Sequence, residues 1–142
     1  MRLGSLLQPG DVICLVGELG SGKTTLVQGV AAGWGSLDPV SSPTFMLVNM
    51  YRRTDGERIY HLDAYRLGSP AEAIELDIEK MIDEGSLIIE WADRIEEALP
   101  GERLWLSLFW VGETQRNLLI SAKGERYQNL LSDLRRQVYG VL

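Results

Sequence analysis

The sequence predicts an α/β fold with a mixed sheet, parallel in its centre and antiparallel at its margins, flanked by helices. Residues 12–16 and 87–89 form two short apolar runs bounded by turn residues, which is typical of strands buried on both faces. Helical patterns alternate with these runs, and this alternation favours a parallel sheet. Two hairpin patterns add antiparallel strands. We expect the whole chain, residues 1–142, to form one domain.

The first strand, at residues 12–16, is followed by a glycine-rich loop and a helix. The helix is expected from about residue 23 to residue 32, because its apolar side chains recur on one side. The stretch Gly33-Trp34-Gly35 is expected to stop it. The first half of the chain therefore begins with a strand-loop-helix unit.

Two hairpins, two further helices and the strand at residues 87–89 complete the expected order of elements. One hairpin has a strand that ends at about Tyr51, a turn at Asp55-Gly56 and a return strand at residues 58–62. A helix is then expected from a Ser69 cap to about Asp83.

The second half of the chain continues after the buried strand at residues 87–89. A second hairpin is expected to pair residues 104–108 with residues 118–120. The closing helix is predicted from one apolar stripe, formed by Leu130, Leu131, Leu134 and Val138.

Charge and composition exclude several classes of protein. The net charge is −6, from 14 basic and 20 acidic residues, so direct binding of free RNA or DNA is not expected. Cys14 is the only cysteine, which excludes a disulfide framework and a cysteine-based zinc site, and its apolar neighbours predict burial. The sequence has no apolar stretch of transmembrane length and no signal-peptide pattern, so we expect a cytoplasmic protein.

The loop after the first strand carries a phosphate-binding pattern. The run GELGSGKT, residues 17–24, fits G-x-x-x-x-G-K-[ST] at every fixed position. Glycines allow backbone N–H groups to turn toward phosphate oxygens, and the following helix adds the positive end of its dipole. We therefore expect a P-loop NTPase-like sandwich. The expected phosphate-binding residues are Gly17, Gly20, Ser21, Gly22, Lys23, Thr24 and Thr25.

Each of these residue types has a defined task in such a loop. Lys23 is expected to reach the β and γ phosphates, and the Thr24 hydroxyl is a ligand for Mg²⁺. The alternative is a glycine-rich turn that binds no ligand.

Hydrolysis also needs groups that hold the metal and the attacking water. Glu90 ends a buried strand, where such enzymes place the acid that holds Mg²⁺, although Asp is the usual residue. Asp63 ends another strand and is a candidate for orienting the water, and Thr44 is a candidate γ-phosphate sensor. The candidate catalytic residues are thus Lys23, Thr44, Asp63 and Glu90, and the candidate metal ligands are Thr24 and Glu90.

Simpler structural roles remain open for these side chains. Glu90 could be an exposed acid at a strand end, Asp63 a turn-forming aspartate and Thr44 a residue that opens a strand. The single histidine, His61, is expected to be a packed or hydrogen-bonded strand residue, and Trp91 either packs in the core or stacks on a ligand or partner.

Four motifs together resemble the TsaE (YjeE) family of bacterial ATPases, which are needed to make threonylcarbamoyladenosine on transfer RNA. The motifs are GELGSGKTTL, then SPTF at residues 42–45, HLDAYR at 61–66 and IEWADR at 89–94. The resemblance implies ATP and Mg²⁺ as cofactors, with the metal on Thr24 and Glu90. It also implies that Asp63 supports hydrolysis and that Thr44 acts as a switch. The implied partner is the TsaB-TsaD heterodimer, which ATP hydrolysis would reset between catalytic rounds.

The chain departs from the family pattern at its start, because only residues 1–10 and the turn residue Asp11 precede the first strand. A strand usual in the family is therefore expected to be shortened or missing, which bears on recognition of the base. The turn at residues 112–116 is a candidate for contacting the base.

Two other functions are compatible with a P-loop. A small-molecule kinase would need an acceptor pocket and an arginine-bearing lid, for which residues 65–69 with Arg66 are the candidate. A nucleotide-sensing subunit would bind and barely hydrolyse. A GTPase is less favoured, because the chain has no N-K-x-D motif. No arginine finger is evident, so we expect slow hydrolysis alone and faster hydrolysis with partners.

Overall fold

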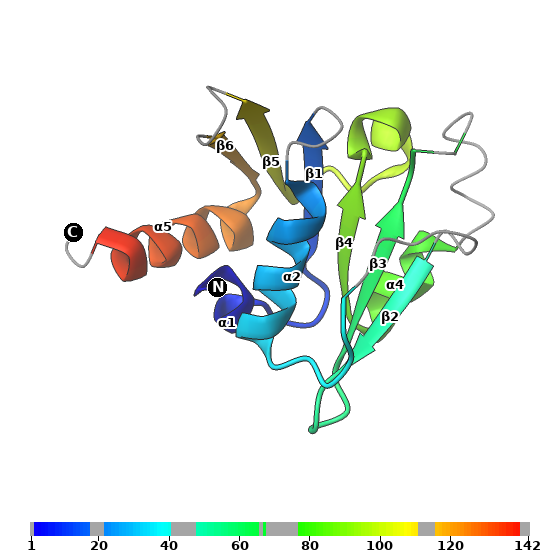
Figure 1. Cartoon of the computed structure of the whole chain (residues 1–142). Coiled ribbons are helices and arrows are strands. Elements are labelled where there is room, and N and C mark those ends of the chain that lie inside the picture. The colour runs from blue at the N-terminus through cyan, green and yellow to red at the C-terminus, as the bar shows by residue number, and fades with distance from the viewer. Residues whose placement is uncertain are drawn as a thin grey trace.

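A computed structural model describes residues 2–17, 22–40, 48–65, 67, 77–110 and 116–139. Six strands and several helices alternate along this part of the chain (Figure 1). In order they are α1 (Arg2–Leu6), β1 (Val12–Gly17), α2 (Lys23–Trp34), β2 (Val48–Arg52), β3 (Arg58–Asp63), α4 (Ile78–Glu84), β4 (Ser86–Glu90), the 3₁₀ segment η1 (Ala92–Ala98), β5 (Arg103–Trp110), β6 (Arg116–Lys123) and α5 (Glu125–Tyr139).

The strands form one sheet in the order β2-β3-β4-β1-β5-β6. The four inner strands are parallel, and the outer strands β2 and β6 pair antiparallel with β3 and β5. The predicted fold class, with a parallel centre and antiparallel margins, is therefore confirmed.

The carboxyl ends of the inner strands lie at one edge of the sheet, where the arrowheads of β1, β3 and β4 point the same way in Figure 1. The register places Glu90 beside both Leu15 and Asp63. Helix α2 also begins at this edge, after the loop that follows β1. Parallel α/β sheets place their ligand sites at this edge.

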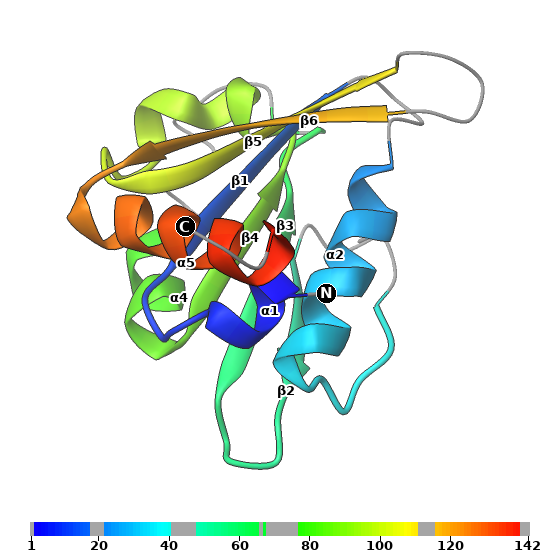
Figure 2. The same cartoon turned by 90° about the vertical axis from the view of Figure 1, so that its left-hand side faces the viewer.

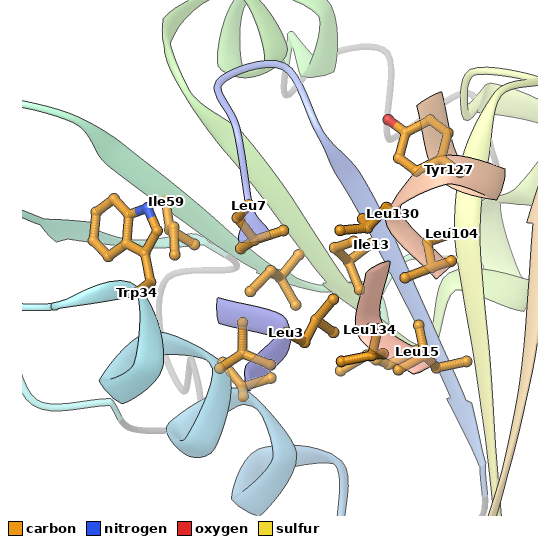
Figure 3. Close-up of a cluster of buried hydrophobic side chains, with 14 of the residues drawn as sticks. Leu3, Leu7, Ile13, Leu15, Trp34, Ile59, Leu104, Tyr127, Leu130 and Leu134 are labelled. Atoms are coloured by element: carbon orange, nitrogen blue, oxygen red, sulfur yellow. The ribbon is translucent and has the colours of Figure 1, made fainter. Parts of the chain in front are cut away.

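Helices cover both faces of the sheet, so each face has its own core. On one face α1, α2 and α5 gather together, and α5 crosses beside α1 (Figure 2). Leucine, valine and aromatic side chains from these helices meet leucine and isoleucine side chains of β1, β3 and β5 (Figure 3). The opposite core contains buried residues of α4 and η1 packed on the other side of the strands. Burial of each valine, leucine or isoleucine side chain contributes about 1.5–3 kcal/mol, so the two cores stabilise the sheet beneath the site.

Most predicted elements lie where the sequence placed them, with corrections at helix ends. Helix α2 runs to Trp34 rather than stopping at Gly33, and Gly35 ends it in the left-handed region at φ 100°, where glycine is favoured. The predicted helix up to residue 83 is not continuous, because Asp77 has φ 55° and caps α4 with its own side chain. The predicted cap Ser69 lies outside the described residues. The residues before β1 carry the short helix α1.

Two smaller predictions concern Cys14 and the membrane. Cys14 is fully buried in β1, and burial raises the pKa of its thiol to about 12, so the predicted packing role is confirmed. Within the described part of the chain, no helix is both long and apolar enough to cross a membrane.

Candidate functional site

The amino end of α2 brings a lysine back over the end of β1. Gly22 precedes the helix with φ 98°, a left-handed conformation that glycine adopts without strain. Lys23 is the first helical residue, and its Nζ donates a hydrogen bond to the Gly17 carbonyl at 2.7 Å. The side chain is 5% exposed. Burial lowers the pKa of Lys23, while the nearby carboxylates of Glu90 and Asp63 act in the opposite direction.

An aromatic residue lies directly against this lysine. The Nζ of Lys23 is 4.2 Å from the centre of the Trp91 ring, within range of a cation–π interaction. Trp91 has φ 59°, an uncommon conformation for a large side chain, and such residues cluster at functional sites. Tyr65 packs on Trp91 with ring centres 4.9 Å apart, and Arg94 lies over both rings. Trp91 therefore lies beside the site.

Glu90 occupies the centre of the site. It is 4% exposed, which excludes the alternative of an exposed acid at a strand end. Its Oε1 accepts a long hydrogen bond of 3.4 Å from the Thr24 hydroxyl, and its Oε2 lies 2.5 Å from Nε2 of His61. A hydroxyl and a carboxylate side by side are hard oxygen ligands, and Mg²⁺ usually takes only one or two of these from the protein. The donor set therefore fits Mg²⁺.

Asp63 lies next to Glu90 on the neighbouring strand. Its Oδ1 accepts the backbone N–H of Tyr65 at 2.9 Å, so it also forms the turn that the sequence left open as an alternative. Burial raises the pKa of the Asp63 carboxyl and the charge of Glu90 raises it further, against the lowering by the hydrogen bond from Tyr65. The two carboxylates thus repel each other in the folded protein.

Replacing Asp63 by asparagine is therefore expected to stabilise the isolated protein. The pKa of Asp63 is higher in the folded state than in the unfolded state, so ionised Asp63 destabilises the fold at neutral pH. This penalty is relieved as the pH falls through the raised pKa. Asparagine keeps the acceptor for Tyr65 and removes the charge. We expect Tm at pH 7 to rise by about 2 °C, as measured by calorimetry, with the difference narrowing as the pH falls through the raised pKa and absent below about pH 4. A lower Tm for the variant at pH 7 would contradict this.

His61 is a functional candidate that the sequence analysis treated only as a packed strand residue. It is fully buried, with Nε2 toward Glu90 and Nδ1 2.7 Å from the Tyr51 hydroxyl. The predicted packed and hydrogen-bonded role is confirmed, but its partner is the central carboxylate. The alternation of β3 carried a signal for this, since His61 and Asp63 lie two residues apart and share a face.

The structure brings together part of the predicted site. Lys23, Thr24, Asp63 and Glu90 meet at the carboxyl edge of the sheet, with Gly17 and Gly22 flanking the loop. Thr25 lies in the first turn of α2 and is exposed. Three predicted residues, Gly20, Ser21 and Thr44, lie outside the described residues, as do Arg66 and positions 112–115 of the candidate base-contact turn. The roles assigned to all of these remain predictions.

The protein has a P-loop-like α/β fold. Its defining features are a buried parallel strand, a loop, a helix that begins Lys-Thr and a carboxylate on the adjacent strand. The model of the family described as threonylcarbamoyl adenosine biosynthesis protein TsaE matches residues 1–118. The chain belongs to the TsaE family.

Individual relatives agree with this assignment. Over 91% of its length, the chain is 42% identical to the tRNA threonylcarbamoyladenosine biosynthesis protein TsaE of Bacillus subtilis, and it covers 80% of that protein. The Streptomyces coelicolor protein of the same name is 37% identical, with 89% of each chain covered. The crystal structure of Bacillus subtilis YdiB superposes with a TM-score of 0.77 at 34% identity, covering 96% of this chain and 85% of that one.

Proposed function

We propose that this protein binds ATP with Mg²⁺ and hydrolyses it slowly, in support of threonylcarbamoyladenosine formation on tRNA. The observation that carries the proposal is the meeting of Lys23, Thr24 and Glu90 at the carboxyl edge of the sheet. The names of the TsaE relatives supply the tRNA modification. We propose a cytoplasmic location for the protein. Because its net charge is −6, we expect no direct contact with nucleic acid.

Each residue has a task in this proposal. Lys23 would exchange its bond with the Gly17 carbonyl for oxygens of the β and γ phosphates. Thr24 and Glu90 would hold Mg²⁺, which supplies positive charge where negative charge develops on the transferred phosphoryl group. Asp63 would orient the attacking water from its position beside Glu90. Thr44 would sense the γ-phosphate, and Gly20, Ser21 and Thr25 would contribute to the phosphate cradle.

The proposed partner is the TsaB-TsaD heterodimer, which ATP hydrolysis on this protein would reset between catalytic rounds. The test is an ATPase assay with and without purified heterodimer. We expect slow release of phosphate by the protein alone and a clear stimulation by the heterodimer. Unchanged turnover would favour a nucleotide sensor. A phosphorylated product from a nucleoside or small-alcohol acceptor would identify a kinase instead.

Replacing Lys23 by alanine is expected to weaken ATP binding by roughly 10-fold or more. The substitution removes charge-assisted hydrogen bonds to phosphate worth about 1.5–3 kcal/mol each. Calorimetric titration gives the dissociation constant, and Lys80→Ala serves as the matched control because Lys80 is exposed on α4. Equal affinity of Lys23→Ala and the parent protein would refute the phosphate-binding role.

A further inference from the structure

A buried chain of three side chains leads from β2 through β3 to the central carboxylate. The Tyr51 hydroxyl is 2.7 Å from Nδ1 of His61, and Nε2 of His61 is 2.5 Å from Oε2 of Glu90. All three side chains are almost completely buried. They come from adjacent strands of the sheet, so their relative positions are fixed by backbone pairing rather than by a loop.

The chemistry of the groups fixes the direction of the hydrogen bonds. An ionised carboxylate only accepts, so the Nε2 atom of His61 must carry the proton that it donates to Glu90. In a neutral imidazole this leaves Nδ1 as an acceptor, and the Tyr51 hydroxyl donates to it. Glu90 thereby fixes the tautomer of a neutral His61, and the Tyr51 hydroxyl holds the other ring nitrogen.

The bond to His61 also divides the two carboxylate oxygens of Glu90 between two tasks. Oε2 is held by the imidazole, and Oε1 is turned toward the Thr24 hydroxyl. Without His61, the carboxylate could rotate about its last bond and lose the orientation that places Oε1 beside Thr24. Partners of this kind orient metal ligands, and their loss typically costs 10–100-fold in metal affinity.

We propose that His61, with its ring held in place by Tyr51, is the positioning residue that presents Glu90 to Mg²⁺ beside the nucleotide phosphates. This inference rests on the proposed function, because it needs a metal at Thr24 and Glu90. It adds a task for His61 that binding of the nucleotide itself does not require. Replacing His61 is therefore expected to reduce the gain in nucleotide affinity that Mg²⁺ provides, and to leave the affinity measured without metal unchanged.

The main test measures ATP affinity by calorimetry in excess Mg²⁺ and in EDTA, for the parent protein and for three replacements of His61. Leucine removes both hydrogen bonds. The amide nitrogen of glutamine reaches the position of Nε2, whereas that of asparagine stops near Nδ1. We expect Leu and Asn to reduce the magnesium-dependent gain in affinity by about 10–100-fold, and Gln to restore most of it. Affinity in EDTA should stay close to that of the parent protein.

A merely structural role for His61 predicts a different pattern. In that case all three replacements would weaken binding equally in Mg²⁺ and in EDTA, and Gln would restore nothing. Tyr51→Phe provides a milder variant if the His61 replacements fold poorly, and it should reduce the magnesium-dependent gain by a smaller factor. In a Glu90→Ala background, His61→Leu should have no further effect on that gain, since its partner is absent.

The tautomer can be observed directly, because His61 is the only histidine in the sequence. Long-range ¹H–¹⁵N correlation spectra of the untagged protein should show a proton on Nε2 of His61, at a fixed pH. Adding Mg²⁺ with a non-hydrolysable ATP analogue should shift the Nε2 resonance. Absence of a proton from Nε2 would overturn the inference.

Failure of the inference is distinguishable from failure of the proposed function. A parent protein that binds ATP in EDTA but gains nothing from Mg²⁺ would overturn the proposed metal pair and this inference together. A magnesium-dependent gain in the parent protein that His61→Leu leaves unchanged would overturn the inference alone.

Discussion

Replacing Glu90 by glutamine is expected to reduce magnesium-dependent ATP hydrolysis by about 10²–10³-fold while leaving the protein folded. The glutamine carbonyl oxygen can still accept the hydrogen bond from His61, so the buried imidazole keeps its partner. The other end of the amide is then an NH₂ group that faces Thr24, and this group cannot ligate a metal. The substitution therefore removes the metal ligand and retains the packing.

The same substitution carries a second expectation of opposite sign. Glu90 places a negative charge near the proposed triphosphate, so its removal should leave ATP affinity in EDTA equal to or higher than that of the parent protein. Single-turnover phosphate release and calorimetric titration measure the two effects. Glu97→Gln is the matched control, because Glu97 is exposed on η1 and should change neither quantity. If Glu90→Gln hydrolyses ATP at the rate of the parent protein, Glu90 is not a ligand of the metal.

The sequence predicted the sheet well because its signals were local. Continuous apolar runs marked β1 and β4, and turn residues such as Asp55 and Gly56 marked the first hairpin. The interruption at Asp77 was missed because apolar periodicity continues across it. A side chain that caps a helix from the left-handed region leaves little trace in such a pattern.

The site was predicted as far as motif and strand position allow. Glu90 and Asp63 each end a strand, and their proximity follows from parallel pairing of β3 with β4. Contacts between distant residues could not be derived in the same way. The bond between His61 and Glu90 depends on the order of strands in the sheet and on rotamers fixed by tertiary packing. The cation–π contact of Lys23 with Trp91 depends on the positive φ angle of Trp91, which no sequence pattern predicted.

Replacing Gly4 by alanine is expected to destabilise the protein by about 3 kcal/mol, because α1 and α2 touch through their backbones at this point. A Cβ on Gly4 would lie 2.0 Å from the Val30 carbonyl oxygen and 2.6 Å from the Trp34 nitrogen. Neither atom belongs to a flexible side chain, so α1 would have to move away by roughly 1 Å, which disturbs the packing of Leu3 in the core.

The matched control for this substitution is Gly101→Ala, where an added Cβ meets nothing within 4 Å and the backbone is not left-handed. Alanine at such a position restricts the unfolded chain and should be neutral or stabilise by about 0.4–1 kcal/mol. Urea denaturation measures both variants. The contrast in sign separates the contact between helices from the general effect of replacing a glycine. Lys23 lies at the other end of α2, so a displaced α2 should also weaken ATP binding by Gly4→Ala. Equal unfolding midpoints for Gly4→Ala and the parent protein would show that α1 does not hold α2 in place.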